Sequence, residues 1–180
     1  EDPYLTGEMA ASFVEGVQSE GVGACIKHFV VNEQETNRMT IDTIVSERAL
    51  REIYLKPFEI AIKKAKPWTV MSSYNKMNGS YTSQNRWLLK KVLRDEWGFE
   101  SFVMTDWFAG DNAAQQIMSE NDLLMPGNTY QIFKNRRPEI EEIKEAYEKG
   151  EITDEMLNER VKTILRVLVN TPAFKGYKYS

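Results

Sequence analysis

The sequence predicts an α/β fold in which parallel strands alternate with helices, as in a partial (β/α)8 barrel. Short apolar runs of strand type alternate with amphipathic helical periods, and no internal repeat, low-complexity tract or Gly/Ser linker interrupts the alternation. A doubly wound sheet fits the same pattern. The 180 residues contain four expected strands, whereas a complete barrel needs eight strands and about 250 residues. We therefore expect roughly the second half of such a barrel.

The first third of the chain is expected to contain a helix, a strand and a second helix. Residues 6–20 place apolar side chains three and four positions apart, which is typical of an amphipathic helix. Residues 22–31 form a short, mostly apolar run of strand type. Residues 46–65 are expected to form a helix with Ser46 as its N-cap and a kink or break at Pro57.

The rest of the chain repeats this alternation. The expected elements are a strand at 68–74, a helix at 85–97, a strand at 101–106, a helix at 111–119, a short strand at 121–125 and two closing helices that begin near Pro138 and at Thr153.

Composition excludes several classes of function. The chain has 23 Lys and Arg against 27 Asp and Glu, a net charge of −4, which disfavours nucleic acid as a partner. No apolar stretch approaches the ~20 residues of a membrane-spanning helix. Cys25 is the only cysteine, so no internal disulfide can form, and a cytoplasmic location is expected. With His28 as the only histidine, a Cys/His zinc cluster is also excluded.

Polar and ionisable side chains stand at the carboxyl ends of three expected strands. The first strand leads to Lys27 and His28, the second to Tyr74, and the third to Asp106 and Trp107. Sites in α/β folds form at these strand ends. Neighbouring cations would keep a carboxylate ionised, and such a set of donors beside an aromatic ring suits a sugar. Gly-rich phosphate loops and a GxSxG nucleophile elbow are both absent.

A plainer role is open to each of these residues. Lys27 fits a surface charge. For His28, a hydrogen-bonded core histidine fits about as well as a functional role. In the same interpretation Tyr74 covers the sheet, Asp106 caps the following segment and Trp107 packs in the core. The functional interpretation depends on several such residues falling at successive strand ends on one side of the sheet.

Three segments resemble family 3 β-glucosidases. Residues 27–38, Lys-His-Phe-Val-Val-Asn-Glu-Gln-Glu-Thr-Asn-Arg, are similar to the KHF(V)xNxQExxR segment of that family. Residues 71–75 and 103–107 match two further family segments in order and at similar spacing. Residues 1–3, 48–54 and 97–99 fit the same pattern, so the resemblance covers essentially the whole chain.

This resemblance implies a retaining glycosidase that removes terminal non-reducing β-D-glucosyl residues, with Asp106 as the nucleophile of a covalent glycosyl-enzyme. The substrate-binding residues that it implies are Lys27, His28 and Arg38 for the hydroxyls of the sugar in the −1 subsite, Tyr74 beside the nucleophile, and Trp107 in the subsite wall. It also implies unusual peptide geometry around Lys27-His28-Phe29, including a cis non-proline bond.

Parts of the family pattern are absent from this sequence. The first barrel strands are missing, together with an Asp and an Arg that grip the same sugar, and so is the general acid/base Glu of the following domain. Neither Glu33 nor Glu35 is therefore assigned that role, and both are expected to stabilise their loop. Residues 1–170 are expected to form the C-terminal portion of the barrel domain, and 171–180 to begin a linker. The fragment is expected to be inactive without the missing barrel half, a second copy or a partner chain.

Alternatives remain open at this point. A β-xylosidase of the same family is one, and a β-N-acetylhexosaminidase is disfavoured because its Lys-His-Phe-Pro-Gly-His type of loop is absent. A non-catalytic sugar-binding or scaffold fragment is another. No metal or organic cofactor is implied, since two carboxylates suffice for this chemistry. The expected partners are a β-glucoside or oligosaccharide, the missing parts of the barrel, and a second copy in a homo-oligomer.

Overall fold

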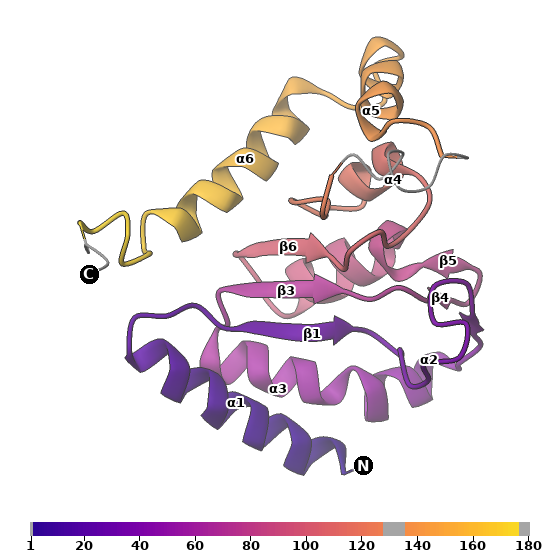
Figure 1. Ribbon diagram of the computed structural model, residues 1–180. Helices are drawn as coiled ribbons and strands as arrows, with labels where there is room; N and C mark the ends of the chain where they lie inside the picture. The colour runs from indigo at the N-terminus through magenta and orange to yellow at the C-terminus, as the bar shows by residue number, and fades with distance from the viewer. Residues whose placement is uncertain (1, 128–135, 177–180) are drawn as a thin grey trace.

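A parallel three-stranded sheet, ordered β1-β3-β6, forms the centre of the computed structural model (Figure 1), which describes residues 2–127 and 136–176. The strands are β1 (Cys25–Phe29), β3 (Thr69–Ser72) and β6 (Phe102–Thr105). Helices follow or precede each of them, so the predicted α/β alternation of a partial barrel is confirmed.

Helices account for most of the remaining described chain. They are α1 (Pro3–Ser19), α2 (Glu47–Ala49), the π-helical η1 (Leu50–Tyr54), α3 (Lys56–Ala65), the 3-10 turn η2 (Thr82–Gln84), the π-helical η3 (Trp87–Glu96), α4 (Ala113–Met118), α5 (Glu139–Glu148) and α6 (Asp154–Leu168). Figure 1 shows α1 and α3 along the β1 side of the sheet, with α4, α5 and α6 beyond β6.

Helix starts follow from capping residues that the sequence already offers. Asp2 accepts a hydrogen bond from Leu5 N at 2.8 Å, which explains why α1 begins at Pro3 rather than at residue 6. Ser46 and Thr153 cap their helices as predicted, by accepting bonds from the amides of the third residue after each. Local side-chain chemistry therefore sets these three boundaries.

The main hydrophobic core lies between the sheet and its covering helices. Val70 and Val103 are fully buried there, while Met71 and Met104, which alternate with them along the strands, are only partly buried on the opposite face. The same core contains Phe29, Leu50, Leu55, Leu88, Leu89, Val92 and Leu93. One face of the sheet is thus closed by helices, and the other remains more open.

One sequence prediction is corrected by the structure, and another is refined. The strand expected at 121–125 is reduced to one bridge, between Met104 and Leu123. The amides of Asp122 and Leu123 both donate to the same carbonyl, that of Val103, so a regular ladder does not form. The helix expected at 46–65 is interrupted at Leu55, next to Pro57, so the predicted break is confirmed, and the part before it is divided further into α2 and the π-helical η1.

A second, small sheet was not predicted. It consists of β2 (Asp42–Thr43), β4 (Lys76–Met77) and β5 (Ser80–Tyr81) in the order β2-β4-β5. These strands are too short to show a period of two in the sequence. They join the loop after β1 to the loop after β3, and so brace the side of the sheet where the polar residues gather.

Candidate active site

Asp106 lies directly after β6, at the carboxyl end of the strand, and is 9% exposed. Its amide donates to Ser72 O at 3.0 Å, which extends the pairing of β6 with β3 by one residue. Its Oδ1 accepts a hydrogen bond from Trp107 N at 2.7 Å. The carboxylate is therefore fixed by the end of the sheet and by the turn that follows it.

His28 reaches Asp106 from β1, two strands away in the sheet. Its Nε2 lies 3.3 Å from Asp106 Oδ2. The Lys27–His28 and Phe29–Val30 peptide bonds are both cis, so the expected cis non-proline bond in this segment is confirmed. The structure brings together two side chains that are far apart in the sequence.

Tyr74 approaches Asp106 from the segment that follows β3, the strand between β1 and β6. It is 8% exposed, and its hydroxyl lies close enough to the Asp106 carboxylate to interact with it electrostatically. Burial raises the pKa of the Tyr74 hydroxyl, and the negative charge of Asp106 raises it further. Tyr74 thus stays protonated and can donate to the carboxylate at neutral pH.

Arg38 covers Tyr74 from the loop after β1. Its guanidinium carbon lies 4.8 Å from the centre of the Tyr74 ring, and its Nη1 lies 2.8 Å from Glu35 Oε2. This ion pair lies within the loop in which Glu35 was expected to have a stabilising role. Arg38 therefore joins the cluster through Tyr74.

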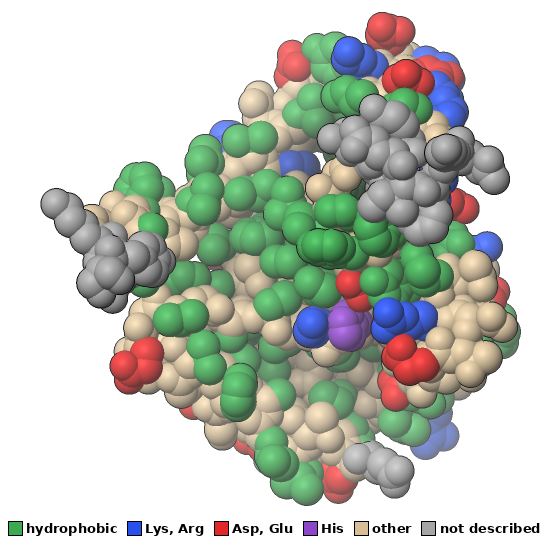
Figure 2. Space-filling view, in the orientation of Figure 1, with side chains coloured by type: hydrophobic (Ala, Val, Ile, Leu, Met, Phe, Trp, Pro, Cys, Tyr) green, Lys and Arg blue, Asp and Glu red, His purple; other side chains and the backbone are tan. Residues whose placement is uncertain are grey.

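The basic residues of this cluster affect His28. Burial lowers the pKa of the His28 imidazole; Lys27 and Arg38 lower it too, whereas Asp106 opposes them. Figure 2 shows the His28 side chain at the surface between basic side chains, with an acidic one beside it. The lowered pKa favours the neutral form of the imidazole at neutral pH.

Trp107 lies at the edge of this cluster and not in the core. It is 52% exposed and packs edge-to-face against Phe108, with 6.0 Å between ring centres. The plainer interpretation of Trp107 as a core residue is therefore wrong. Its side chain is free to form a wall of an open site.

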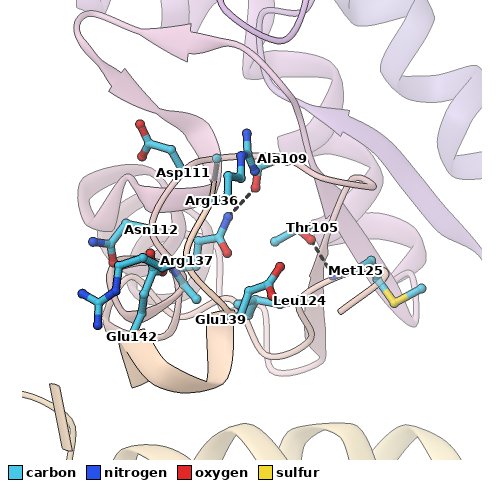
Figure 3. A pocket seen from close by; sticks show the side chains of 13 residues that line it. Thr105, Ala109, Asp111, Asn112, Leu124, Met125, Arg136, Arg137, Glu139 and Glu142 are labelled. Atoms are coloured by element: carbon cyan, nitrogen blue, oxygen red, sulfur yellow. Dashed lines mark hydrogen bonds between the residues drawn. The ribbon is translucent and has the colours of Figure 1, made fainter. Parts of the chain in front are cut away.

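One nearby residue was missed by sequence reasoning. Arg136 Nη1 donates to the backbone carbonyl of Phe108 at 3.2 Å, thirty residues downstream of Asp106. Figure 3 shows Arg136 close to Ala109 in the wall of a small cavity. A bond to a backbone carbonyl leaves no signature in the sequence, so no motif could have pointed to it.

The fold and this cluster define an α/β barrel-type protein with a group of ionisable side chains at the carboxyl ends of its strands. Residues 1–167 match the model of the glycosyl hydrolase family 3 N-terminal domain. The chain belongs to glycosyl hydrolase family 3, and the resemblance stated above is confirmed.

Similar proteins in this family are known in sequence and in structure. Over 168 residues the chain is 49% identical to thermostable beta-glucosidase B of Acetivibrio thermocellus, covering 93% of this chain and 21% of that protein. Over 126 residues it is 54% identical to an exo-alpha-(1->6)-L-arabinopyranosidase of Bifidobacterium longum, covering 70% and 17%. The structure of beta-glucosidase 3B from Thermotoga neapolitana in complex with glucose superposes with a TM-score of 0.96 at 69% identity, covering 100% of this chain and 25% of that one.

The chain therefore spans between about a sixth and a quarter of the length of these proteins. Within the described ranges, no three His, Cys, Asp or Glu side chains are grouped so as to hold a metal ion. No helix in residues 2–127 or 136–176 is long and apolar enough to cross a membrane.

Proposed function

We propose that this chain forms part of the active site of a retaining β-glucosidase, with Asp106 as the nucleophile. The observation that carries the proposal is the Asp106 carboxylate at the end of β6, which His28, Tyr74 and the Trp107 amide contact from three directions. Membership of glycosyl hydrolase family 3, together with relatives named beta-glucosidase, supports the substrate class.

In the proposed mechanism, an Asp106 oxygen attacks the anomeric carbon as the bond from that carbon to the leaving oxygen breaks. A general acid protonates the leaving oxygen, and a covalent glycosyl-enzyme ester forms. Water, deprotonated by the same group acting as base, then attacks the anomeric carbon and releases the Asp106 carboxylate. Two inversions give net retention, and no redox partner or metal enters the balance.

The surrounding residues have distinct proposed roles. Lys27, His28 and Arg38 hold hydroxyl groups of the sugar in the −1 subsite. Tyr74 donates a hydrogen bond to the carboxylate and releases it as the ester forms. Trp107, which is half exposed, offers an aromatic face to the C–H groups of the sugar.

The remaining parts of the site are proposed to lie outside these 180 residues. Residues 1–170 then form the later portion of the barrel domain, and 171–180, of which 177–180 lie outside the described residues, begin a linker. Exposed apolar stripes support this: Leu5, Met9 and Phe13 on α1, and Val161, Leu165 and Leu168 on α6. Both stripes face away from the packed core, as expected of helices that complete a larger barrel. The cytoplasmic location of the protein remains a prediction.

A second candidate substrate is a terminal α-L-arabinopyranoside. The relative with that activity in its name is 54% identical to this chain over 126 residues. The beta-glucosidase of Acetivibrio thermocellus is 49% identical over 168 residues. The β-xyloside alternative also remains, because xylopyranose differs from glucopyranose only in lacking the hydroxymethyl group on C5. Rates on aryl β-D-glucoside, β-D-xyloside and α-L-arabinopyranoside would rank the three.

The proposal is tested by mass spectrometry of the intact polypeptide that carries these residues, before and after incubation with a 2-deoxy-2-fluoro-β-glucoside. We expect a mass increase of one fluoroglycosyl group, located by peptide mapping on Asp106. An adduct on another residue, or none in a folded and active polypeptide, would refute the assignment. An aryl glycoside assay of the 180-residue chain alone is expected to give no activity.

A further inference from the structure

The turn that carries Asp106 and Trp107 contains an unfavourable backbone conformation. Phe108 has φ of +67°, in the left-handed region that non-glycine residues rarely adopt. Such a conformation is strained and persists only where surrounding contacts determine it. The turn therefore needs groups that hold it, and these groups determine where Asp106 and Trp107 point.

Three hydrogen bonds hold the turn. Ala109 N donates to Asp106 O at 3.1 Å and closes it, and Phe108 N donates to Met125 O at 3.0 Å. Arg136 Nη1 donates to Phe108 O at 3.2 Å. Both polar groups of the Phe108 backbone are thus bonded, one by a neighbouring backbone and one by a side chain.

Arg136 is brought to the turn by the segment that leads into α5. Helix α5 itself contacts the start of α4, where Glu142 Oε2 accepts a hydrogen bond from Ala113 N at 2.7 Å. Between the two contacts lies a cavity of only about 30 Å³, lined by Thr105, Asp111 and Arg136 among others (Figure 3). The two parts of the chain are thus close together on either side of a space that holds little more than a water molecule.

We propose that Arg136 is a positioning residue for the nucleophile: its bond to Phe108 O stabilises the left-handed turn and thereby orients Asp106 and Trp107. This inference rests on the proposed function of Asp106. Arg136 is not proposed to contact the sugar. Its effect reaches the reaction through the backbone of residues 106–109.

The neighbouring arginine provides a matched control. Arg137 pairs with Glu145 at 2.8 Å on α5, and its side chain is 58% exposed. Arg136→Met and Arg137→Met each remove one positive charge from adjacent positions. Only the first removes a hydrogen bond to the turn.

The experiment measures the rate of labelling of the intact polypeptide by the 2-deoxy-2-fluoro-β-glucoside at saturating reagent. We expect Arg136→Met to slow labelling by about 10- to 100-fold, the range that follows from misplacing a reacting group by about 1 Å. The concentration of reagent at half-saturation should change little, because the sugar contacts remain. Arg137→Met should label at the original rate.

Phe108→Gly distinguishes a positioning role from loss of folding. Glycine adopts positive φ without penalty, so the further loss caused by Arg136→Met should shrink to a few-fold in that background. Labelling of Arg136→Met at the original rate, or an undiminished loss in the glycine background, would overturn the inference. If the unmodified protein is not labelled on Asp106 at all, it is the proposed function that fails.

Discussion

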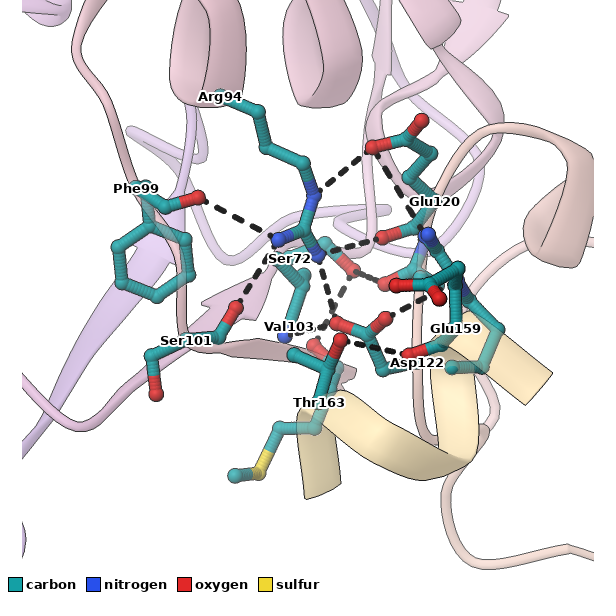
Figure 4. A network of polar contacts seen from close by, with 12 residues as sticks. Ser72, Arg94, Phe99, Ser101, Val103, Glu120, Asp122, Glu159 and Thr163 are labelled. Carbon is teal, nitrogen blue, oxygen red and sulfur yellow. Dashed lines mark hydrogen bonds and ion pairs between the residues drawn. The ribbon is translucent and has the colours of Figure 1, made fainter. Parts of the chain in front are cut away.

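Two clusters of charged residues lie at opposite ends of β6, and they differ in how fully their charges are paired. At the amino end, Arg94, Glu120, Asp122 and Arg160 form a buried set (Figure 4) whose side chains are at most 15% exposed. At the carboxyl end is the set around Asp106. One strand thus supports two groups of ionisable residues with opposite properties.

The amino-end cluster is closed. Arg94 Nη2 lies 2.6 Å from Asp122 Oδ2, Arg160 Nε lies 3.2 Å from Asp122 Oδ1, and Val103 N donates to Asp122 at 2.8 Å. Burial nevertheless raises the pKa of the Asp122 carboxyl, so its partners do not fully offset the cost of desolvating its charge. All the strong contacts of this carboxylate are made within the protein.

The carboxyl-end cluster is open. Lys27 is exposed and has no ion-pair partner within residues 2–127 or 136–176, and Arg38 pairs only with an exposed glutamate of its own loop. His28 keeps 33% of its side chain accessible. The comparison shows that charge alone does not mark a site; donors and cations that still lack partners do.

The largest expected effect separates the two clusters by activity. Asp106→Asn keeps an oxygen that can accept the Trp107 amide but removes the nucleophile, so activity of the intact polypeptide should fall by at least about 1000-fold. Its free energy of unfolding should change by less than about 1.5 kcal/mol. Steady-state kinetics and chemical denaturation measure the two quantities.

Asp111→Asn is the control for that substitution, because this exposed carboxylate lies in the same loop. It should leave both quantities unchanged. Retention of more than a tenth of the activity by Asp106→Asn would show that the carboxyl-end cluster is no more catalytic than its buried counterpart.

The second substitution, at Asp122, is expected to reduce stability and to leave activity unchanged. Asp122→Asn can still accept the Val103 amide but leaves Arg94 and Arg160 with one carboxylate fewer, so the free energy of unfolding should fall by about 3–5 kcal/mol. Activity per folded molecule should be preserved. Asp95→Asn, which breaks only an exposed pair with Lys90, should have no measurable effect on unfolding.

Much of the open cluster was predictable from the sequence and almost none of the closed one. Lys27 and His28 lie in the carboxyl-terminal half of β1, Tyr74 follows β3 by two residues, and Asp106 directly follows β6, so position along the strands places them near one edge of the sheet. The members of the closed cluster come from a helix, a loop and another helix. Their pairing depends on how those elements pack, which residue spacing does not encode.

The elements of the fold show the same limit. Helices and strands of regular period were predictable, as were the Ser46 and Thr153 caps. The π-helical geometry of η1 and η3 was not, since a shift of one residue in hydrogen bonding leaves the apolar pattern almost unchanged. The left-handed Phe108 was equally hidden, because bulky residues rarely adopt that conformation and nothing in the sequence marks the exception.

The smallest expected effect is a shift in the pKa of His28, which tests directly whether the two clusters are electrostatically separate. His28 is the only histidine of the 180-residue sequence, so the imidazole NMR signals of this chain report the carboxyl-end cluster without overlap. Its pKa should lie below the ordinary value of 6.5, because burial, Lys27 and Arg38 all disfavour the charged ring. Asp106→Asn should lower the pKa further, since it removes the carboxylate that opposes them.

The same shift predicts the direction of the pH dependence of stability. When the folded-state pKa of a histidine is lowered, the unfolded chain binds more protons than the folded one between that pKa and about 6.5. The contribution of His28 to stability is therefore lost as the pH falls through this window. Asp122→Asn, at the other end of β6, should leave the His28 titration unchanged in the folded fraction. If Asp106→Asn and Asp122→Asn moved the His28 pKa equally, the two clusters would be electrostatically coupled along the strand, and the division between a closed structural end and an open reactive end would not hold.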